Sequence, residues 1–130
     1  MKNIIFKLLE YLYYFSLVSL FILYLFPGSL IGYFLYGNSG QQPDLITNPI
    51  GTSINHLISF IYLSSLAFIV RVKERKFINS FKFLFFTSIV LEILHYFIPN
   101  RAFEYYDLFA NFIGVIFAYL FIKFMLKLKM

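Results

Sequence analysis

Long apolar segments alternate with short polar ones along the chain, and this pattern predicts membrane helices. The apolar segments cover about residues 8–26, 50–70, 77–97 and 107–126. Each is close to the ~20 residues that a helix needs to cross the hydrocarbon core of a bilayer. The segments are continuous and lack the alternation of barrel strands. We therefore expect an all-α integral membrane bundle of four transmembrane helices with antiparallel neighbours, formed by a single domain over residues 1–130.

Turn-forming residues separate these segments. The first ends at Pro27-Gly28 and is too long for a signal peptide, so we expect a retained helix. The connector 28–49 is rich in glycine, asparagine and proline, and within it lies a short apolar piece, residues 30–36. We expect this piece to lie in the membrane interface, with Tyr33 and Tyr36 at headgroup level. The alternative is a connector without regular structure.

Composition strengthens the membrane interpretation and excludes several functions. The chain is 61% hydrophobic and its mean hydropathy is +0.79, which is too apolar for a soluble domain of 130 residues. It has no cysteine, which excludes a disulfide framework, a thiolate nucleophile and a cysteine metal site. The net charge of +5 comes from basic residues that flank the apolar segments. They form no stripe of their own, so we expect no binding to nucleic acid.

The positions of the basic residues predict the orientation. They gather before the first apolar segment, between the second and third, and after the fourth: Lys2, Lys7, Arg71, Lys73, Arg75, Lys76, Lys123, Lys127 and Lys129. The connector 28–49 has none, and the turn between the third and fourth segments has only Arg101. By the positive-inside rule, we expect a multi-pass protein of the bacterial inner (cytoplasmic) membrane with both termini in the cytoplasm.

Polar side chains gather at the opposite, outward-facing ends of the predicted helices. They are His56, Glu92, His95, Arg101, Asp107 and Asn111. Ionisable groups in a membrane are costly, so they usually persist because they pair or act. Two antiparallel helices joined by a short turn are neighbours, so pairing of Arg101 with Glu92 or Asp107 is sterically reasonable. We expect these residues to form an outward-facing polar pocket.

Each of these residues also has a purely structural explanation. Asp107 stands where a helix begins and can act as a helix cap. Asn111 can be a packing amide, and the two histidines can be interfacial residues. Glu92 is hardest to explain in this way, because apolar residues flank it on both sides. A structural ion pair between Glu92 and Arg101 would account for both.

Small residues recur every four positions in the fourth segment, at Ala110, Gly114 and Ala118. Such a stripe lets two membrane helices approach closely. We expect this face to pack against another helix of the bundle.

The second half of the chain resembles the VanZ-like family of small multi-span membrane proteins. The matching positions are Glu92, Pro99, Arg101, Asp107, Leu108, Asn111 and Gly114, and His56 resembles the histidine of the family's second membrane helix. The resemblance covers about residues 50–120. The family is named for an accessory protein associated with glycopeptide (teicoplanin) resistance. The resemblance therefore implies a membrane fold and a link to resistance or envelope physiology.

Two departures from the family pattern affect the expectations for metal binding and for acid–base chemistry. The family often has glutamine at the position of His95, and often has Asp-Lys where this chain has Thr52-Ser53. His56, Glu92, His95 and Asp107 include possible zinc ligands. A site that accepts glutamine for His95 is a poor candidate for obligatory zinc, so we expect no metal and no cofactor. The missing Asp-Lys pair removes an acid–base partner.

Three functions remain open from the sequence. The leading one is a pocket that binds a cell-envelope or lipid-linked headgroup, with Arg101 on an anionic group and His56, His95, Asp107, Asn111 and Glu92 around it. The second is a membrane enzyme acting on a lipid-linked substrate, with Glu92 or His56 as general base. The third is a structural or assembly subunit. The expected partners are membrane lipids, a lipid-linked envelope component and other membrane proteins.

Overall fold

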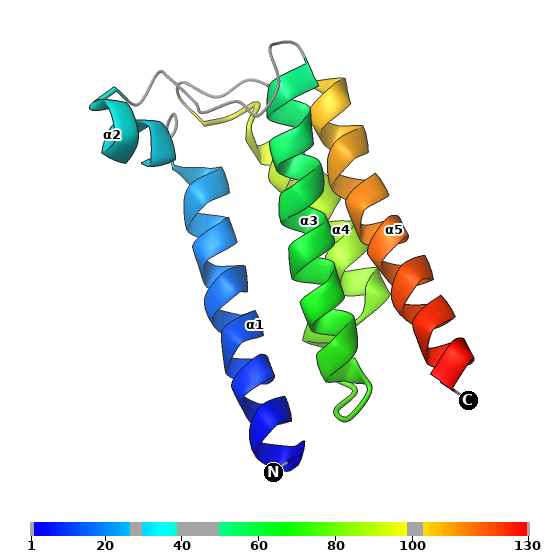
Figure 1. The fold of residues 1–130 in the computed structure, drawn as a ribbon. Helices are drawn as coiled ribbons and strands as arrows, with labels where there is room; N and C mark the ends of the chain where they lie inside the picture. The colour runs from blue at the N-terminus through cyan, green and yellow to red at the C-terminus, as the bar shows by residue number, and fades with distance from the viewer. Residues whose placement is uncertain (1, 27–29, 39–49, 99–102, 130) are drawn as a thin grey trace.

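The computed structural model describes residues 2–26, 30–38, 50–98 and 103–129, and this part of the chain is helical without strands (Figure 1). The helices are α1 (Lys2–Leu25), α2 (Leu30–Tyr36), α3 (Ile50–Arg71), α4 (Phe81–Leu94) and α5 (Tyr105–Lys129), with a short 3₁₀ helix η1 (Phe77–Asn79) before α4. Both termini and the α3–α4 connection lie at one end of the bundle (Figure 1). The expected all-α architecture is confirmed.

Among the described helices, α1, α3 and α5 are long and apolar enough to cross a membrane, over Asn3–Leu25, Ser53–Arg71 and Tyr105–Leu128. They correspond to the first, second and fourth predicted spans. The protein is therefore a membrane protein with at least these three candidate spans.

The third predicted span, residues 77–97, forms a shorter helix than expected. Ser80 caps the start of α4 by accepting a hydrogen bond from the backbone N–H of Phe83 at 3.2 Å. At the other end, the amides of Tyr96 and Phe97 bond to carbonyls three residues back, so the helix gives way to tight turns. The 14 residues of α4 extend about 21 Å, less than the ~30 Å hydrocarbon core. A fourth span of membrane length is not confirmed.

The short apolar piece predicted between the first two spans forms helix α2. Gly37 ends it with a φ of 69°, and its amide bonds to the carbonyl of Tyr33 at 2.9 Å. A glycine in the left-handed region is a common helix terminator, because it carries no Cβ that would clash. The side chains of Tyr33 and Tyr36 are about half exposed. The placement of α2 in the membrane interface stays a prediction.

Helix α5 packs most extensively against α3, and also against α4, while α1 covers another side of α3. Close approach of α5 to α3 requires Gly114. A Cβ there would lie 2.9 Å from the carbonyl oxygen of Leu57 and 3.0 Å from the Cβ of Phe60. Ala118, one turn further along, is fully buried, and Ala110 is partly buried. The apolar core consists of Tyr13, Leu17, Leu20, Tyr24, Phe60, Leu63, Leu66, Ala67, Phe68, Val70, Leu84, Leu91, Val115 and Ala118.

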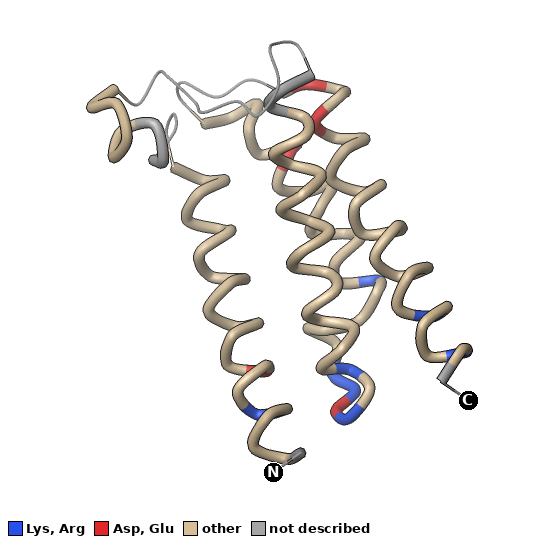
Figure 2. The backbone as a smooth tube through the Cα atoms, viewed as in Figure 1, with Lys and Arg blue, Asp and Glu red and all other residues tan. Residues whose placement is uncertain are grey.

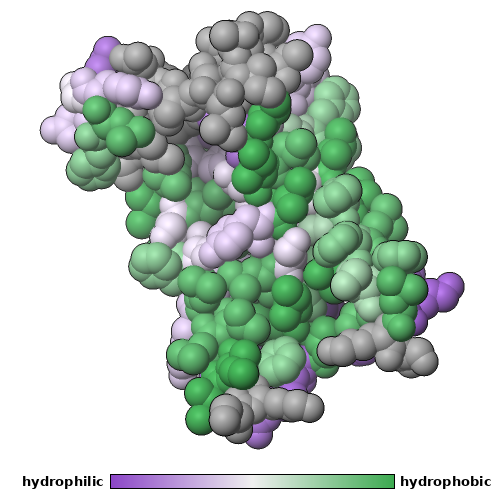
Figure 3. All heavy atoms as spheres, viewed as in Figure 1, coloured by the Kyte–Doolittle hydropathy of each residue, from purple (hydrophilic) through white to green (hydrophobic). Residues whose placement is uncertain are grey.

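The outer surface of the bundle is apolar. Large side chains such as Phe15, Phe86 and Phe117 are more than half exposed. Figure 3 shows hydrophobic residues covering the middle of the molecule, with hydrophilic ones near the end that carries the termini. A soluble monomer rarely exposes an apolar surface of this extent, whereas lipid contact accounts for it.

Charged residues divide between the two ends of the bundle. Lysines and arginines gather at the end with the termini and the α3–α4 connection, whereas acidic residues near the end of α4 and the start of α5 lie at the opposite end (Figure 2). At the basic end, Lys76 pairs with Glu10 of α1 at 2.8 Å and with Glu74 at 3.2 Å. Hydrogen bonds to Glu10 and Glu74 raise the pKa of Lys76. This contact joins α1 to the α3–α4 connection.

A second contact at this end is the bond from the Tyr13 hydroxyl to the carbonyl oxygen of Ile78 in η1. We expect Tyr13→Phe to lower the free energy of unfolding by about 0.5–1.5 kcal/mol, because the partly buried carbonyl of Ile78 loses its donor. Tyr11→Phe is the matched control, since the side chain of Tyr11 is 64% exposed on the same helix. Thermal unfolding in detergent micelles measures the stability of both variants. Equal losses for the two variants would contradict the importance of this bond.

Candidate functional site

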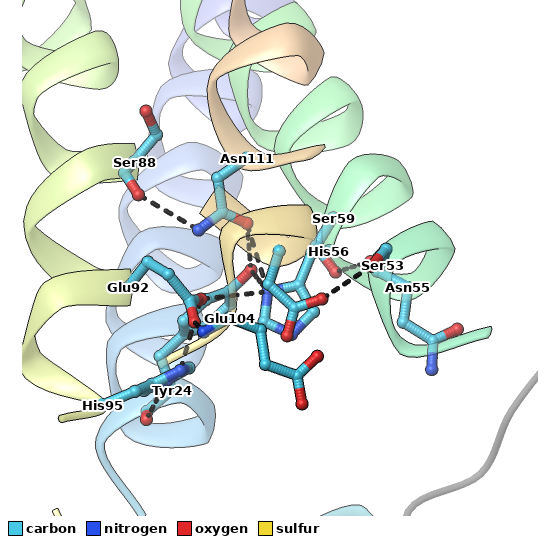
Figure 4. Close-up of polar contacts among 11 residues, drawn as sticks. Tyr24, Ser53, Asn55, His56, Ser59, Ser88, Glu92, His95, Glu104 and Asn111 are labelled. Carbon is cyan, nitrogen blue, oxygen red and sulfur yellow. Dashed lines mark hydrogen bonds and ion pairs between the residues drawn. The ribbon is translucent and has the colours of Figure 1, made fainter. Parts of the chain in front are cut away.

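A buried group of polar side chains lies at the end of the bundle opposite the termini, and we call it the polar cluster. Its members come from α1, α3, α4 with the residue that follows it, and α5 (Figure 4). Each is at most 6% exposed: Tyr24, His56, Glu92, His95, Asp107 and Asn111. Burying this many polar groups is costly unless they satisfy one another or a ligand.

His56 lies at the centre of the polar cluster, and its hydrogen bonds define its tautomer. The amide nitrogen of Asn111 donates to the carbonyl of Ser88 at 3.0 Å, so its oxygen, Oδ1, faces His56. Oδ1 accepts the Tyr24 hydroxyl proton at 2.9 Å and lies 3.1 Å from His56 Nδ1. The Tyr24 oxygen is also 2.7 Å from Nδ1. Both neighbours of Nδ1 therefore accept, so Nδ1 carries a proton.

Two carboxylates lie close to the His56 ring. Glu92 Oε2 is 3.8 Å from Nδ1, and Asp107 Oδ2 is 3.6 Å from Nε2. Both distances exceed those of a hydrogen bond. The other Asp107 oxygen accepts from the Ser53 hydroxyl at 2.8 Å, which fixes the carboxylate from one helical turn before His56 on α3. The imidazole thus has a carboxylate oxygen within 4 Å of each ring nitrogen.

His95 joins the carboxylate of Glu92 to helix α1. Its Nε2 lies 2.9 Å from the backbone carbonyl of Tyr24, which can only accept, so Nε2 donates. Its Nδ1 lies 3.3 Å from Glu92 Oε2. The ring of His95 also stacks on that of Tyr24.

Glu104, just before α5, bounds the polar cluster. Its backbone N–H donates to Glu92 Oε1 at 3.2 Å, while its own side chain is exposed. Partial burial raises the pKa of Glu104, and the negative charges of Asp107 and Glu92 act in the same direction. A third acidic group at this end adds to the negative potential.

The structure brings together five residues that the sequence singled out for the pocket: His56, Glu92, His95, Asp107 and Asn111. Asp107 lies in the first turn of α5, where the helix dipole favours an acid, and it contacts α3 as well. Arg101, predicted to pair with the acids, and the Pro99-Asn100 turn lie outside the described residues.

Sequence reasoning missed three contributors: Tyr24, Ser53 and Ser88. Tyr24 is one of 11 tyrosines and stands in an apolar helix, so nothing in the sequence separates it from the others. Ser88 contributes a backbone carbonyl, which carries no sequence signal. Ser53 stands three residues before His56, a spacing that places both on one helix face.

An apolar groove of about 420 Å³ lies between α3 and α5 beside the polar cluster. Ser53, whose hydroxyl bonds Asp107, forms part of its wall. The remaining lining is almost entirely apolar: Ile54, Leu57, Tyr106, Phe109, Ala110 and Ile113. The groove therefore adjoins a buried acid at one point and offers hydrocarbon contacts elsewhere.

The chemistry of the polar cluster is that of proton exchange or cation binding. His56, Glu92 and Asp107 each offer a ligand atom within 4.8 Å of the others. A histidine flanked by carboxylates is also a common acid–base arrangement.

Comparison with known families identifies the chain. The sequence profile of the VanZ/LLP1 family matches residues 53–126, more than half of the protein. The chain belongs to the VanZ/LLP1 family. The matched region contains every member of the polar cluster except Tyr24. No curated protein and no solved structure shows significant similarity to the chain.

Proposed function

We propose that this VanZ/LLP1 protein binds the headgroup of a cell-envelope or lipid-linked component at the outer face of the bacterial cytoplasmic membrane. The observation that carries the proposal is the adjacency of the buried polar cluster and the apolar groove, which share the Ser53–Asp107 contact. A lipid-linked molecule needs both environments, because its headgroup is polar and its chains are apolar. The groove offers an apolar surface for a lipid chain, and the polar cluster offers hydrogen-bond donors and acceptors for the headgroup.

The orientation belongs to the same proposal. The polar cluster lies at the end away from the termini and the basic α3–α4 connection (Figure 2). With the basic end in the cytoplasm, the polar cluster faces outward and both termini lie inside. Helix α4, extended by η1 and by the turns after Leu94, would form the fourth crossing of the bilayer.

The polar cluster gives a headgroup several kinds of contact. Asn111 and His56 offer hydrogen bonds, while Glu92 and Asp107 lie beside the imidazole of His56. We assign the anionic part of the headgroup to Arg101, the only basic residue in the turn between the last two predicted spans. Guanidinium is well suited to phosphate, because it donates two parallel hydrogen bonds.

Mass spectrometry of lipids that remain on the purified protein tests the proposal. We expect Arg101→Ala to lower retention of an anionic envelope lipid by about ten-fold or more, the loss that follows from removing charged hydrogen bonds. Arg75→Ala, which removes the same charge at the opposite end, is the matched control and should retain the lipid. Equal retention in both variants would reject headgroup binding.

Enzymatic action on the lipid is the second candidate, favoured by the position of His56 between Glu92 and Asp107. His56 or Glu92 would act as the general base. Incubation of the purified protein with a lipid-linked substrate separates the two functions. A bound lipid returns with its mass unchanged, whereas an enzyme returns a product whose amount falls in Glu92→Gln.

A further inference from the structure

We propose that His56, Glu92 and Asp107 form a binding site for a divalent transition-metal ion of the zinc class. One ligand atom from each residue lies within 4.8 Å of the other two, and all three side chains are buried. Ligand atoms that share a zinc ion are about 3.2–4 Å apart, since each bond is about 2 Å long. The widest separation exceeds that range by roughly 1 Å, a gap that side-chain torsions can close.

The hydrogen bonds of His56 prepare one ring nitrogen for metal. Nδ1 donates toward Asn111 Oδ1 and the Tyr24 oxygen, so the lone pair of the neutral ring is on Nε2. Nε2 faces Asp107 Oδ2 at 3.6 Å, too far for a hydrogen bond and close to the spacing of two ligands on one ion. Metal-binding histidines usually donate their other N–H to a fixed acceptor. Asn111, itself anchored on Ser88, has that role here.

Glu92 supplies the second observation that points to a cation. Its side chain is fully buried, and its Oε2 accepts no hydrogen bond from the described residues. Among the described residues, the basic atoms within 4 Å of Oε2 are His95 Nδ1 at 3.3 Å and His56 Nδ1 at 3.8 Å. A carboxylate oxygen buried in this way is stabilised by a metal ion.

The structure removes the reason for expecting no metal. That expectation rested on glutamine taking the place of His95 in related sequences, but His95 is not one of the three ligands. Its Nε2 is engaged with the Tyr24 carbonyl, and it approaches Glu92 from outside the triad. Glutamine at position 95 would leave all three proposed ligands in place.

The ligand set favours zinc over the alkaline-earth cations. Mg²⁺ and Ca²⁺ prefer oxygen ligands throughout, and Mg²⁺ requires a near-octahedral set. One imidazole and two carboxylates match borderline ions such as Zn²⁺. Three protein ligands also leave a coordination position open, to which water or an anionic group can bind. The site does not depend on the proposed binding of a lipid headgroup.

The test measures Zn²⁺ alone on the full chain in detergent. The purified protein is stripped with chelator, loaded with Zn²⁺, desalted, and analysed for metal by mass spectrometry, with Co²⁺ absorption reporting coordination. We expect wild type to retain stoichiometric zinc, and Glu92→Gln and Asp107→Asn to lose it. Asn111→Ala should weaken binding by about 10–100-fold, as for other residues that orient a ligand.

One control separates ligation from general effects. Glu104→Gln removes an exposed acid at the same end. This variant should keep zinc, and circular dichroism confirms that every variant compared is helical. Wild type that keeps only traces of zinc overturns the proposal. So does equal retention in wild type and Asp107→Asn, or loss of zinc in Glu104→Gln.

Discussion

Gly114→Leu is expected to separate α3 from α5 and to give the largest loss of stability in the bundle. Even the Cβ of alanine would lie 2.9 Å from the Leu57 carbonyl oxygen and 3.2 Å from the Ile61 amide nitrogen. Both are backbone atoms of a helix, so neither can move aside alone. Overpacking of this kind costs about 1–3 kcal/mol for small additions. Leucine should exceed that range and alanine should fall within it.

Unfolding in detergent, followed by circular dichroism, measures this effect. Phe117→Leu is the control, because Phe117 is 55% exposed on the same helix and its replacement leaves the α3 contact intact. We expect a graded order in the unfolding midpoint, with wild type above Gly114→Ala and that variant above Gly114→Leu. A midpoint for Gly114→Leu equal to that of the control would show that the two helices do not depend on this close approach.

The second large effect concerns the buried pair of Glu92 and His95. We expect His95→Leu to lower the free energy of unfolding by about 3–5 kcal/mol, because Glu92 then loses the nearer of its two imidazoles while it stays buried. Removing the charge as well should restore part of this loss. The double variant Glu92→Gln with His95→Leu is therefore expected to be more stable than His95→Leu alone.

A double-mutant cycle measures the coupling between the two side chains. Wild type, His95→Leu, Glu92→Gln and the double variant are unfolded under identical conditions. Exposed Tyr96, beside His95, supplies the control Tyr96→Leu, which should change stability little. Strictly additive losses in the cycle would show that His95 and Glu92 do not interact.

The sequence predicted the helical class and most of the spans because hydropathy reports directly on burial in a bilayer. It overestimated the length of α4 because apolar residues continue on both sides of the helix. Ser80 and the turns after Leu94 set the actual ends. Helix capping depends on one hydroxyl and on backbone geometry, and a hydropathy pattern reports neither of them. The length of an apolar segment is therefore an upper bound on its helix.

The sequence likewise predicted only some of the residues of the site. Ionisable residues such as Glu92 and Asp107 stand out in an apolar chain, so the sequence could select them. It could not select Tyr24, because a tyrosine in a membrane helix is ordinary until its neighbours are known. Nor could it assign roles to the histidines. The tautomer of His56 follows from the amide orientation of Asn111, which depends on a carbonyl of another helix.

Tyr24 lies in α1, outside the region that matches the family profile, yet its hydroxyl bonds both His56 and Asn111 and its carbonyl accepts from His95. The segment that defines family membership and the segment that completes the polar cluster are therefore not the same. A fragment of residues 53–126 would lack one wall of the polar cluster. A chimera that exchanges the first helix between two relatives would exchange a residue of the site along with the membrane anchor.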